Sequence, residues 1–388
     1  MKIDQVEFYY LAEDTIYDIG DGSQDALVVH VIMDDGSDGW GECEASPLVS
    51  IAAWCCPMSH MACKGLKDTV IGFTINTPAD IYALTDAVRR NSFDLLQADH
   101  TLSGIDIALW DMLGRKLGLP VWKLLGYERS YAKTAYASQL FGDTPQETYQ
   151  KALQSRSGGY RAAKFGWGPF GHGTVQQDVE HVEAAREGLG NDVALMVDAG
   201  TVWVDDVERA SAILPVLEKC NAVWLEEPFT SGALKEYGLL SSRKDFLAGG
   251  EGAHNPEMAY NLIDFGKVAF IQIDTGRIGG ISSAKKVAEY AAARKIKYVN
   301  HTFTTTLALV SSMEPFAGLE NSPWCEFPVE STLLAQKLTV KRVLPDSNGQ
   351  ITLGDEPGLG VEVNPEALKR YGKEVTLTYE NEILWRSK

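Results

Sequence analysis

The middle of the chain alternates between short apolar runs and longer amphipathic segments. Between about residues 134 and 328, eight β-rich apolar runs are separated by stretches whose apolar residues recur at helical spacing. Strands that are apolar throughout and are separated by helices predict a parallel sheet covered on both faces. Eight such strands suggest a closed barrel. In chain order, the runs are KTAYAS, YRAAKF, VALMVD, AVWLEE, FLAGGE, AFIQID, KYVNH and SPWCEF.

The regions on either side of this alternation have other patterns. The stretch ALVVHVIMDDGSDGWGE predicts two strands around a turn. The stretch LSGIDIALWDMLGRKLGLPVWKLLG predicts a helix, with Ser103 as its N-cap and with Gly118 and Pro120 at its end. After about residue 330 the chain returns to shorter elements, which are expected to fold back onto the first region. The predicted boundaries are 1–125, 126–330 and 331–388.

Length and charge limit the kinds of protein that this chain can be. A chain of 388 residues is too long for one ordinary core and fits one large domain with a smaller one. The formal charge of −18 argues against nucleic acid and anionic membranes as partners, since both need a basic surface. No apolar run is long enough to span a bilayer, and the first ten residues lack the layout of a signal peptide. A cytoplasmic location is therefore expected.

Five of the apolar runs end on a polar or ionisable residue, each separated from the next by the length of one βα unit. Residues that are distant in the chain are thus expected to lie side by side on the rim formed by the carboxyl ends of the strands. In a barrel of this kind, that rim is where active sites lie. The five positions are Asp198, Glu226 or Glu227, Glu251, Asp274 and His301.

Three neighbouring strand ends, those with Asp198, Glu226 or Glu227, and Glu251, carry carboxylates, which predicts a metal site. Oxygen ligands without thiolates or clustered imidazoles favour Mg²⁺ over zinc or copper. Because Mg²⁺ keeps positions open for other oxygens, the substrate is expected to be a chelating oxyanion. Side chains alternate along a strand, so only one of Glu226 and Glu227 can point toward the cation, and the pattern does not say which.

The other ionisable residues at the strand ends are Asp274 and His301, with Lys164 and Glu326 in addition. Asp274 is expected to hold one imidazole nitrogen of His301, which leaves the other nitrogen as a base with a pKa near the working pH. Lys164 is expected to act as a base or as an electrostatic clamp beside a metal-bound anion. Glu326 is expected to donate a hydrogen bond to a substrate oxygen if burial keeps it protonated.

These residues and several local motifs give the chain a family resemblance. Its motifs are VDAG, WLEEPF, AGGE, QIDTGRIGG, VNH and IDIALWDMLGRKLGLPVWKLLG, and its strand-end order is Lys164, Asp198, Glu226, Glu251, Asp274, His301 and Glu326. In both respects the chain resembles the mandelate racemase subgroup of the enolase superfamily, over essentially its whole length.

The resemblance implies a fold, a site and a chemistry. The fold would be a modified (β/α)7β barrel, with an α+β capping domain made from the N-terminal region and the C-terminal tail. Loops of the cap, around YDIGDG and ASPLVSIAAW, would close over the substrate. The resemblance also implies a homo-oligomer, a dimer or an octamer. Asp198, Glu226 and Glu251 would bind Mg²⁺, and Asp274 with His301 would remove the proton α to a carboxylate.

Two departures from the family pattern narrow the reaction. Racemases of this subgroup carry Lys-x-Lys at the second barrel strand, whereas this chain has Gly166 in place of the second lysine. The Asn that often follows the first metal Asp is replaced by Gly200. With one good base, the simplest reaction is abstraction of the α-proton and loss of a β-hydroxyl. The chain is therefore expected to be a Mg²⁺-dependent dehydratase of a sugar acid that yields a 2-keto-3-deoxy acid.

Two other functions stay open. An epimerase, racemase or cycloisomerase on the same scaffold would need a second acid/base. His172 in the loop GPFGHG, Lys164 and Arg277 are the candidates for that group or for a substrate contact. The more distant alternative is a non-catalytic protein that keeps the fold.

Overall fold

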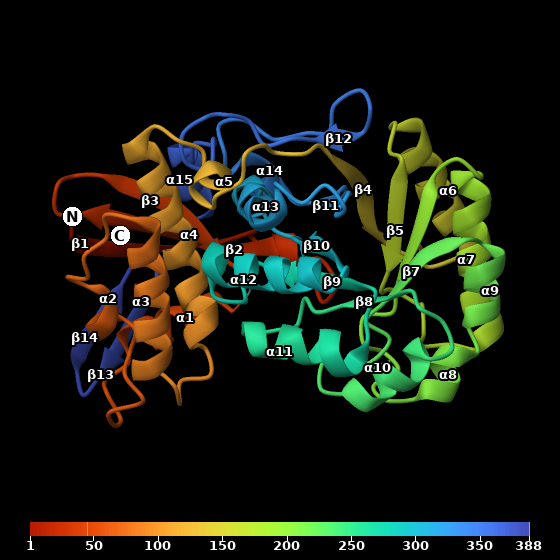
Figure 1. Cartoon of the computed structure of the whole chain (residues 1–388), viewed down its shortest axis with the longest axis horizontal. Helices are drawn as coiled ribbons and strands as arrows, with labels where there is room; N and C mark the ends of the chain where they lie inside the picture. Colours follow the sequence, from red (N-terminus) through yellow and green to blue (C-terminus); the bar gives the residue numbers. More distant parts are fainter. Residues whose placement is uncertain (45, 388) are drawn as a thin grey trace.

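The computed structural model describes residues 1–44 and 46–387, and its centre is a barrel of parallel strands (Figure 1). The strands follow the order β10-β9-β8-β7-β6-β5-β4-β11, and all neighbours in this order are parallel. Every one overlaps a predicted apolar run. They are β4 (Lys133–Leu140), β5 (Ala162–Gly166), β6 (Ala194–Asp198), β7 (Ala222–Glu226), β8 (Leu247–Gly249), β9 (Phe270–Asp274), β10 (Lys297–His301) and β11 (Trp324–Pro328).

Helices join the first seven strands to the strands that follow them, which confirms the modified (β/α)7β arrangement. These helices are α6 (Pro145–Ser157), α7 (Val175–Leu189), α8 (Val207–Ser211), α9 (Leu214–Lys219), α10 (Leu234–Ser241), α11 (Pro256–Asn261), η2 (Leu262–Gly266), α12 (Gly280–Ala293), α13 (Thr306–Met313) and η3 (Glu314–Phe316).

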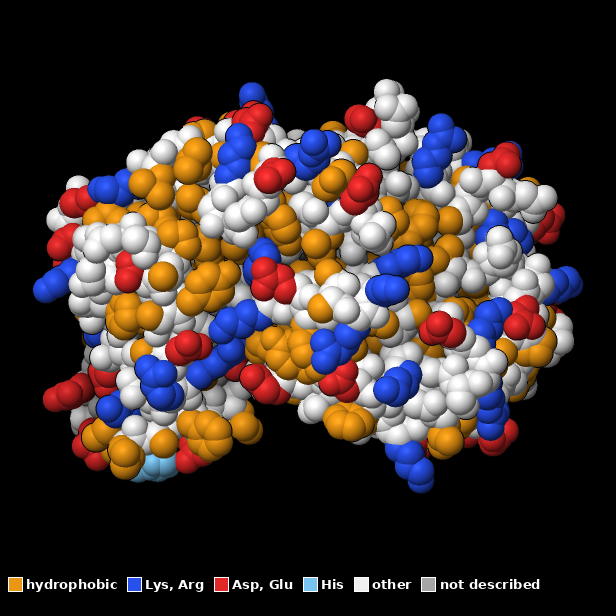
Figure 2. Space-filling model, in the orientation of Figure 1, with side chains coloured by type: hydrophobic (Ala, Val, Ile, Leu, Met, Phe, Trp, Pro, Cys, Tyr) orange, Lys and Arg blue, Asp and Glu red, His pale blue; other side chains and the backbone are white. Residues whose placement is uncertain are grey.

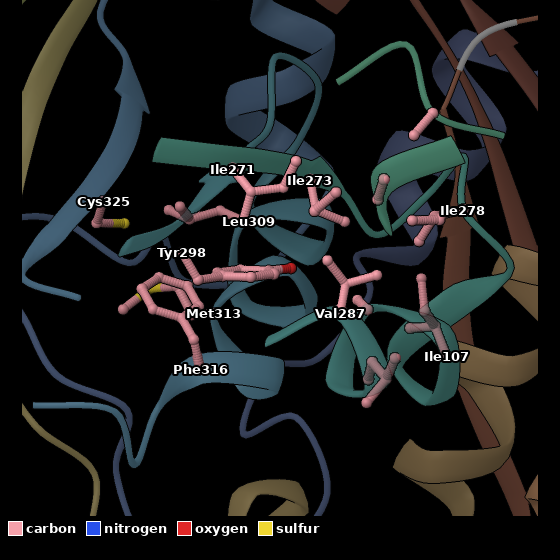
Figure 3. Close-up of a cluster of buried hydrophobic side chains, with 14 of the residues drawn as sticks. Ile107, Ile271, Ile273, Ile278, Val287, Tyr298, Leu309, Met313, Phe316 and Cys325 are labelled. Atoms are coloured by element: carbon pink, nitrogen blue, oxygen red, sulfur yellow. The ribbon is translucent and has the colours of Figure 1, made fainter. Parts of the chain in front are cut away.

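The strands are apolar throughout because both of their faces are buried. Side chains that point into the barrel form an inner cluster, which includes Tyr136, Met196, Trp224 and Phe270. The alternate side chains point outward against the helices. Figure 3 shows this outer layer, in which Ile271 and Ile273 of β9 and Tyr298 of β10 lie against Val287, Leu309, Met313 and Phe316 from the covering helices. Burial on both faces removes the alternation that a one-sided sheet would show.

Side chains bridge the seam where the strand order ends, between β10 and β11. The Asn300 side chain accepts a hydrogen bond from the backbone N–H of Glu326 (2.9 Å), and the N–H of Thr302 donates to the Glu326 carboxylate (2.9 Å). The N–H of Tyr298 donates to Ser322 Oγ (3.0 Å). These bonds nearly close the barrel without a continuous backbone ladder at this position.

The N-terminal region forms the cap, with a three-stranded antiparallel sheet in the order β1-β2-β3. The predicted pair of strands around DDGSDG is β2 and β3. The elements are β1 (Ile3–Ala12), η1 (Gly22–Gln24), β2 (Asp25–Met33), β3 (Asp38–Cys43), α1 (Pro47–Cys55), α2 (Lys67–Val70), α3 (Pro78–Asn91), α4 (Ala98–Leu117) and α5 (Val121–Leu124).

Helix α4 corrects one prediction and confirms another. It begins at Ala98, so Ser103 is not its N-cap. The Ser103 hydroxyl instead accepts the N–H of Gly279, the residue that precedes helix α12 of the barrel (2.9 Å). The predicted end is confirmed, because Gly118 adopts the left-handed conformation (φ 67°) that terminates helices. In the sequence, a serine that accepts a hydrogen bond from the start of a different helix looks the same as a serine that caps its own helix.

The C-terminal segment runs back along the barrel and reaches the cap. Its elements are α14 (Leu333–Lys337), β12 (Gln350–Ile351), α15 (Pro365–Tyr371), β13 (Thr376–Tyr379) and β14 (Glu382–Arg386). Strand β12 pairs antiparallel with β4, and the N–H of Lys373 donates to the carbonyl of Tyr10 in β1 (2.8 Å). Figure 1 shows both termini at the cap end of the molecule. The domain boundaries at 125 and 330 stay a prediction.

The surface carries charges of both signs. Figure 2 shows basic and acidic side chains interspersed over one face of the molecule. In the described part of the chain, no helix combines the length and the apolarity needed to cross a membrane.

Candidate active site

Strand register places the predicted residues together on one rim of the barrel. Gly166, Asp198 and Glu226 are direct neighbours at the carboxyl ends of β5, β6 and β7. Asp274 and His301 are direct neighbours at the ends of β9 and β10. Because the strands are parallel and in register, residues far apart in the sequence meet at the same height.

Asp274 and His301 form the predicted pair. The Nδ1 atom of His301 lies 2.6 Å from Asp274 Oδ2, and both side chains are buried. The other oxygen of Asp274 accepts the N–H of Gly276 (2.7 Å). Burial acts to raise the pKa of Asp274, but the bond from His301 and the charge of Arg277 hold it below its ordinary value. An ionised Asp274 fixes the proton of His301 on Nδ1 and turns Nε2 toward the rest of the site.

The surroundings of His301 are more acidic than the sequence indicated. Its Nε2 atom lies 3.2 Å from Glu251 Oε2 and 4.0 Å from Glu326 Oε2. Burial acts to lower the pKa of His301, but the charges of Glu251, Glu326 and Asp274 raise it to about 10. The pKa of His301 therefore lies above the near-neutral value expected from the sequence. Neutralising negative charge near Nε2 is what would bring it back toward the working range.

Lys164 lies on the opposite side of the rim as a buried cation. Its Nζ atom is 2.5 Å from Glu226 Oε1, 2.9 Å from Glu326 Oε1 and 3.5 Å from Asp198 Oδ2. Burial acts to lower the pKa of Lys164, but Glu226 and Glu326 raise it well above its ordinary value. A lysine held in this way is a positive charge rather than a free base.

Glu326 differs from the expectation of a protonated donor. It is fully buried, and it accepts hydrogen bonds from Ser138 Oγ (2.9 Å) and from the N–H of Thr302 (2.9 Å). Burial acts to raise the pKa of Glu326, yet Lys164 and His301 hold it below its ordinary value. Glu326 is therefore an ionised acceptor that joins the lysine side of the rim to the histidine side.

The predicted metal ligands fit Mg²⁺ in chemistry, because all three offer carboxylate oxygens. Asp198 and Glu251 line the central cavity, and burial, opposed by Lys164 and reinforced by Glu251, raises the pKa of Asp198 to about 6. Glu226 is instead engaged by Lys164 and by the indole N–H of Trp224 (2.9 Å). Within residues 1–44 and 46–387, no three His, Cys, Asp or Glu side chains converge closely enough to hold a metal ion. The ligand set therefore stays a prediction.

Glu227 lies next to the same group of acids. It follows β7 in a left-handed conformation (φ 37°), and its Oε1 accepts the N–H of Gly250 (3.3 Å). Burial and the nearby charges of Glu251 and Asp198 raise its pKa to about 8. Burial and the charges of Asp198 and Glu251 also act to raise the pKa of Glu226. Both adjacent glutamates therefore lie near the same acids, and this proximity does not show which of the two would bind a cation.

A cavity of about 270 Å³ lies between this rim and the cap. The barrel contributes Lys164, Asp198, Glu251, Arg277 and His301, and the cap contributes residues 19–22 from the expected YDIGDG loop. The second expected stretch, ASPLVSIAAW, contributes no lining residue in its described part, where most of it forms helix α1. Its first residue, Ala45, lies outside the described residues.

The two glycines that depart from the family pattern are both tightly enclosed. A Cβ atom at Gly166 would lie 2.7 Å from Asp198 Cβ and 2.8 Å from its Oδ2 atom. A Cβ atom at Gly200, where φ is +54°, would lie 2.8 Å from the indole of Trp167. Trp167 lines the cavity and also approaches Gly20 of the cap loop. The space that a larger side chain would need at position 166 or 200 is therefore already occupied by neighbouring side chains.

His172 does not join the site. It is exposed and lines a separate cavity, together with Asp143, Pro169 and His181. The loop GPFGHG therefore does not fold over the rim, and His172 does not supply a second acid/base in this structure.

Arg277 and Glu44 form a pair at the edge of the cavity. Arg277 Nη2 lies 3.2 Å from Glu44 Oε1, and Nη1 lies 3.7 Å from Glu251 Oε1. Glu44 was missed by the sequence reasoning, which ended the predicted pair of strands at Glu42, whereas β3 runs on to the buried Cys43 and Glu44 follows it directly. The acids of the barrel rim were identified because each follows a buried strand. The same criterion would have identified Glu44 in the cap.

Comparison with protein-family models agrees with this fold. The model described as "Enolase C-terminal domain-like" matches residues 147–367. The model described as "Mandelate racemase / muconate lactonizing enzyme, N-terminal domain" matches residues 19–126. The chain belongs to the enolase superfamily, with both domains of the mandelate racemase and muconate lactonizing enzyme type.

Individual relatives catalyse several reactions. The chain is 27% identical to D-galactarolactone cycloisomerase of Agrobacterium fabrum, over 89% of this chain and 90% of the relative. It is 29% identical to arabinonate dehydratase of Saccharolobus solfataricus, over 70% of this chain and 71% of the relative. A crystal structure described as a predicted mandelate racemase from Rhodobacter sphaeroides is 51% identical and superposes with a TM-score of 0.96, over 100% of this chain and 99% of that one.

Proposed function

We propose that this protein is a Mg²⁺-dependent dehydratase of a sugar acid. The main support for the proposal is that a base is found on only one side of the described site. The Asp274–His301 pair lies on that side, and Asp198 leaves no room for a second base at Gly166 on the other. A racemase needs acid/base groups on both faces of the α-carbon. A dehydratase needs one base and a leaving group.

The residues of this chain divide the reaction between them. His301 Nε2 takes the proton from the carbon α to the carboxylate, while Asp274 stabilises the imidazolium that forms. Lys164 places a positive charge beside the developing dianion. Loss of the β-hydroxyl then gives an enol that becomes a 2-keto-3-deoxy acid.

The metal is part of the proposal. Members of the superfamily generally bind Mg²⁺. Asp198, Glu226 and Glu251 would hold it, and it would supply positive charge to the enediolate oxygens and offset the carboxylates that raise the pKa of His301.

A cycloisomerase of a sugar-acid lactone or anhydro ring is the second candidate. The relative from A. fabrum, which covers 89% of this chain, has such an activity by name. Opening a ring by β-elimination would use the same base and the same enediolate. The second acid/base that this reaction needs would come from a group other than His172, which lines a separate cavity. The non-catalytic alternative is weakened because all of the predicted acids, the lysine and the histidine are present on the rim.

Proton NMR in D₂O tests the proposal. The purified protein with Mg²⁺ is mixed with hexonates, pentonates, aldarates and their lactones. Appearance of 3-deoxy signals from an open-chain acid would support dehydration and identify the substrate, whereas the same signals from a lactone alone would favour the cycloisomerase. A new isomer without a 3-deoxy product, or loss of the C2 proton signal alone, would reject dehydration in favour of an isomerase.

A further inference from the structure

Glu44 is a buried carboxyl group of the cap that faces the central cavity. It is 4% exposed and lines the cavity together with His301 and Arg277. Its Oε1 atom pairs with Arg277 Nη2 at 3.2 Å. In the described part of the chain, its Oε2 atom has no hydrogen-bond or ion-pair partner. One oxygen is thus anchored, and the other is left for a bound molecule.

The backbone fixes Glu44 on the same side of the cavity as the Asp274–His301 pair. The N–H of Glu44 donates to the carbonyl of Gly276 (3.1 Å), and the N–H of Gly276 donates to Asp274 (2.7 Å). A Cβ atom at Gly276 would lie 2.9 Å from Glu44 Cβ and 3.1 Å from Asp274 Oδ1. Glycine at this position therefore lets the cap carboxyl approach the pair closely. Lys164 lies on β5, across the rim.

The cap loop lies close beside the Glu44 carboxylate. A Cβ atom at Gly22 would lie 3.3 Å from Glu44 Oε1 and 3.6 Å from Phe303 Cβ. A side chain at Gly22 would therefore crowd the Glu44 carboxylate. The cap thus contributes a carboxyl group to the cavity that His301 also lines.

We propose that Glu44 is the general acid that protonates the departing β-oxygen of the substrate. The inference rests on the proposed function, because it concerns the second half of the β-elimination. It gives the two protons of the reaction to two groups on the same face, His301 for the α-proton and Glu44 for the leaving oxygen.

The proton balance closes with these two groups. His301 takes the α-proton, the β C–O bond breaks, and the oxygen leaves with its electron pair and the proton of Glu44, as water or as a ring-opened hydroxyl. His301 then returns its proton to the β-carbon of the enol while the enol O–H proton passes to Glu44. Burial and the charge of Asp274, opposed by Arg277 and His301, raise the pKa of Glu44 to about 7, so part of the population carries the proton at neutral pH.

Glu44→Gln tests the acid role by separating the two steps. In D₂O, the variant should exchange the substrate C2 proton within about threefold of the wild-type rate. It should lose 3-deoxy product formation by about 100-fold or more, as expected on removal of a general acid. Glu42→Gln is the matched control. Glu42 lies two residues earlier on β3 and is buried against Thr305, so its variant should keep both rates.

A fluorinated substrate sharpens the test. Fluoride leaves without a proton, so Glu44→Gln should release fluoride from the 3-deoxy-3-fluoro analogue within about threefold of the wild-type rate. Elimination by Glu44→Gln at the wild-type rate would overturn the acid role. Equal losses of exchange and elimination, with no rescue by the fluoro analogue, would also overturn it and show that Glu44 only positions Arg277. A wild-type protein that exchanges but never eliminates would overturn the proposed function itself.

Discussion

At the scale of single residues, the site is a chain of ion pairs in which each charge is set by its neighbours. Glu326 touches Lys164 with one oxygen, and its other oxygen lies 4.0 Å from His301. Its pKa is lowered rather than raised, although it is fully buried. Burial alone favours the neutral acid, but two nearby cations reverse that preference. Such a reversal depends on which groups meet, so the residue type and its place in the chain did not reveal it.

The two adjacent glutamates after β7 give a matched pair of variants. Glu226→Gln should weaken Mg²⁺ binding by 10-fold or more, on the order of 1.4 kcal/mol, because it removes a predicted carboxylate ligand. Glu227→Gln should change it much less, because Glu227 Oε1 serves the N–H of Gly250. Isothermal titration with Mg²⁺ measures both. The reverse order of effects would assign the ligand to Glu227.

The pair of Asp274 and His301 predicts a variant that separates binding from turnover. His301→Asn should lower the rate of α-proton exchange by about 10²-fold to 10⁴-fold, since it removes the base. It should leave Mg²⁺ binding in place, because His301 is not a predicted ligand. Exchange by NMR and Mg²⁺ titration test the two halves. Near-normal exchange would remove the pair from the mechanism.

At the scale of secondary-structure elements, the barrel is closed by side chains where strands β10 and β11 meet. Asn300 is fully buried; its Oδ1 accepts the N–H of Glu326, and its Nδ2 donates to Ser312 Oγ (3.0 Å). The apolar pattern identified both strands as members of the barrel. It did not indicate that a polar side chain inside the motif VNH would replace a backbone bond between them.

Removing this bridge should destabilise the fold. Asn300→Ala leaves a buried N–H without a partner and should lower the free energy of unfolding by about 1–3 kcal/mol. Ser312→Ala removes only the second contact of the same amide, so its loss should be smaller. Denaturant unfolding followed by circular dichroism measures both. Equal stability of Asn300→Ala and the wild type would show that another group closes the seam.

At the scale of the whole molecule, helix α4 of the cap docks against the first turn of barrel helix α12. Asp106 accepts the N–H of Ser282 (3.0 Å), Trp110 donates to Ser282 Oγ (2.9 Å), and Ser103 accepts the N–H of Gly279 (2.9 Å). The cap therefore supplies the N-terminal capping groups of a barrel helix. This joins helix α12, which follows the loop with Asp274 and Arg277, to the cap that carries Glu44.

This contact predicts a pH dependence of stability. Burial, opposed by the hydrogen bonds from Ser282, raises the pKa of Asp106 to about 7 from an ordinary 3.8. The folded state thus holds this proton more tightly than the unfolded state. The stability that Asp106 contributes is complete below about pH 4 and falls as the pH rises toward 7, by roughly 1.4 kcal/mol for each pKa unit.

Asp106→Asn should remove that part of the pH dependence, because the amide does not titrate. The melting temperature of the variant should therefore fall less than that of the wild type between pH 5 and pH 8. The exposed Asp192→Asn substitution is the control and should follow the wild type. Parallel curves for Asp106→Asn and the wild type would contradict the assignment of this proton to Asp106.

Assembly and location belong to the same scale. The homo-oligomer, dimer or octamer, stays a prediction, and light scattering would test it as a multiple of the 42.5 kDa chain mass. The cytoplasmic location also stays a prediction.

The sequence by itself determined the barrel strands and the rim residues, because both follow from local periodicity. Strands buried on two faces read as apolar runs, and parallel strands bring the residues at their ends to one rim. The tertiary structure alone decided how those residues meet. In the folded chain, Glu226 pairs with Lys164, and Glu326 is held in its ionised form. His172 lines a separate cavity, and Glu44 of the cap lies beside the loop that follows Asp274. These outcomes depend on distances between segments far apart in the chain, which a pattern of neighbouring residues does not contain.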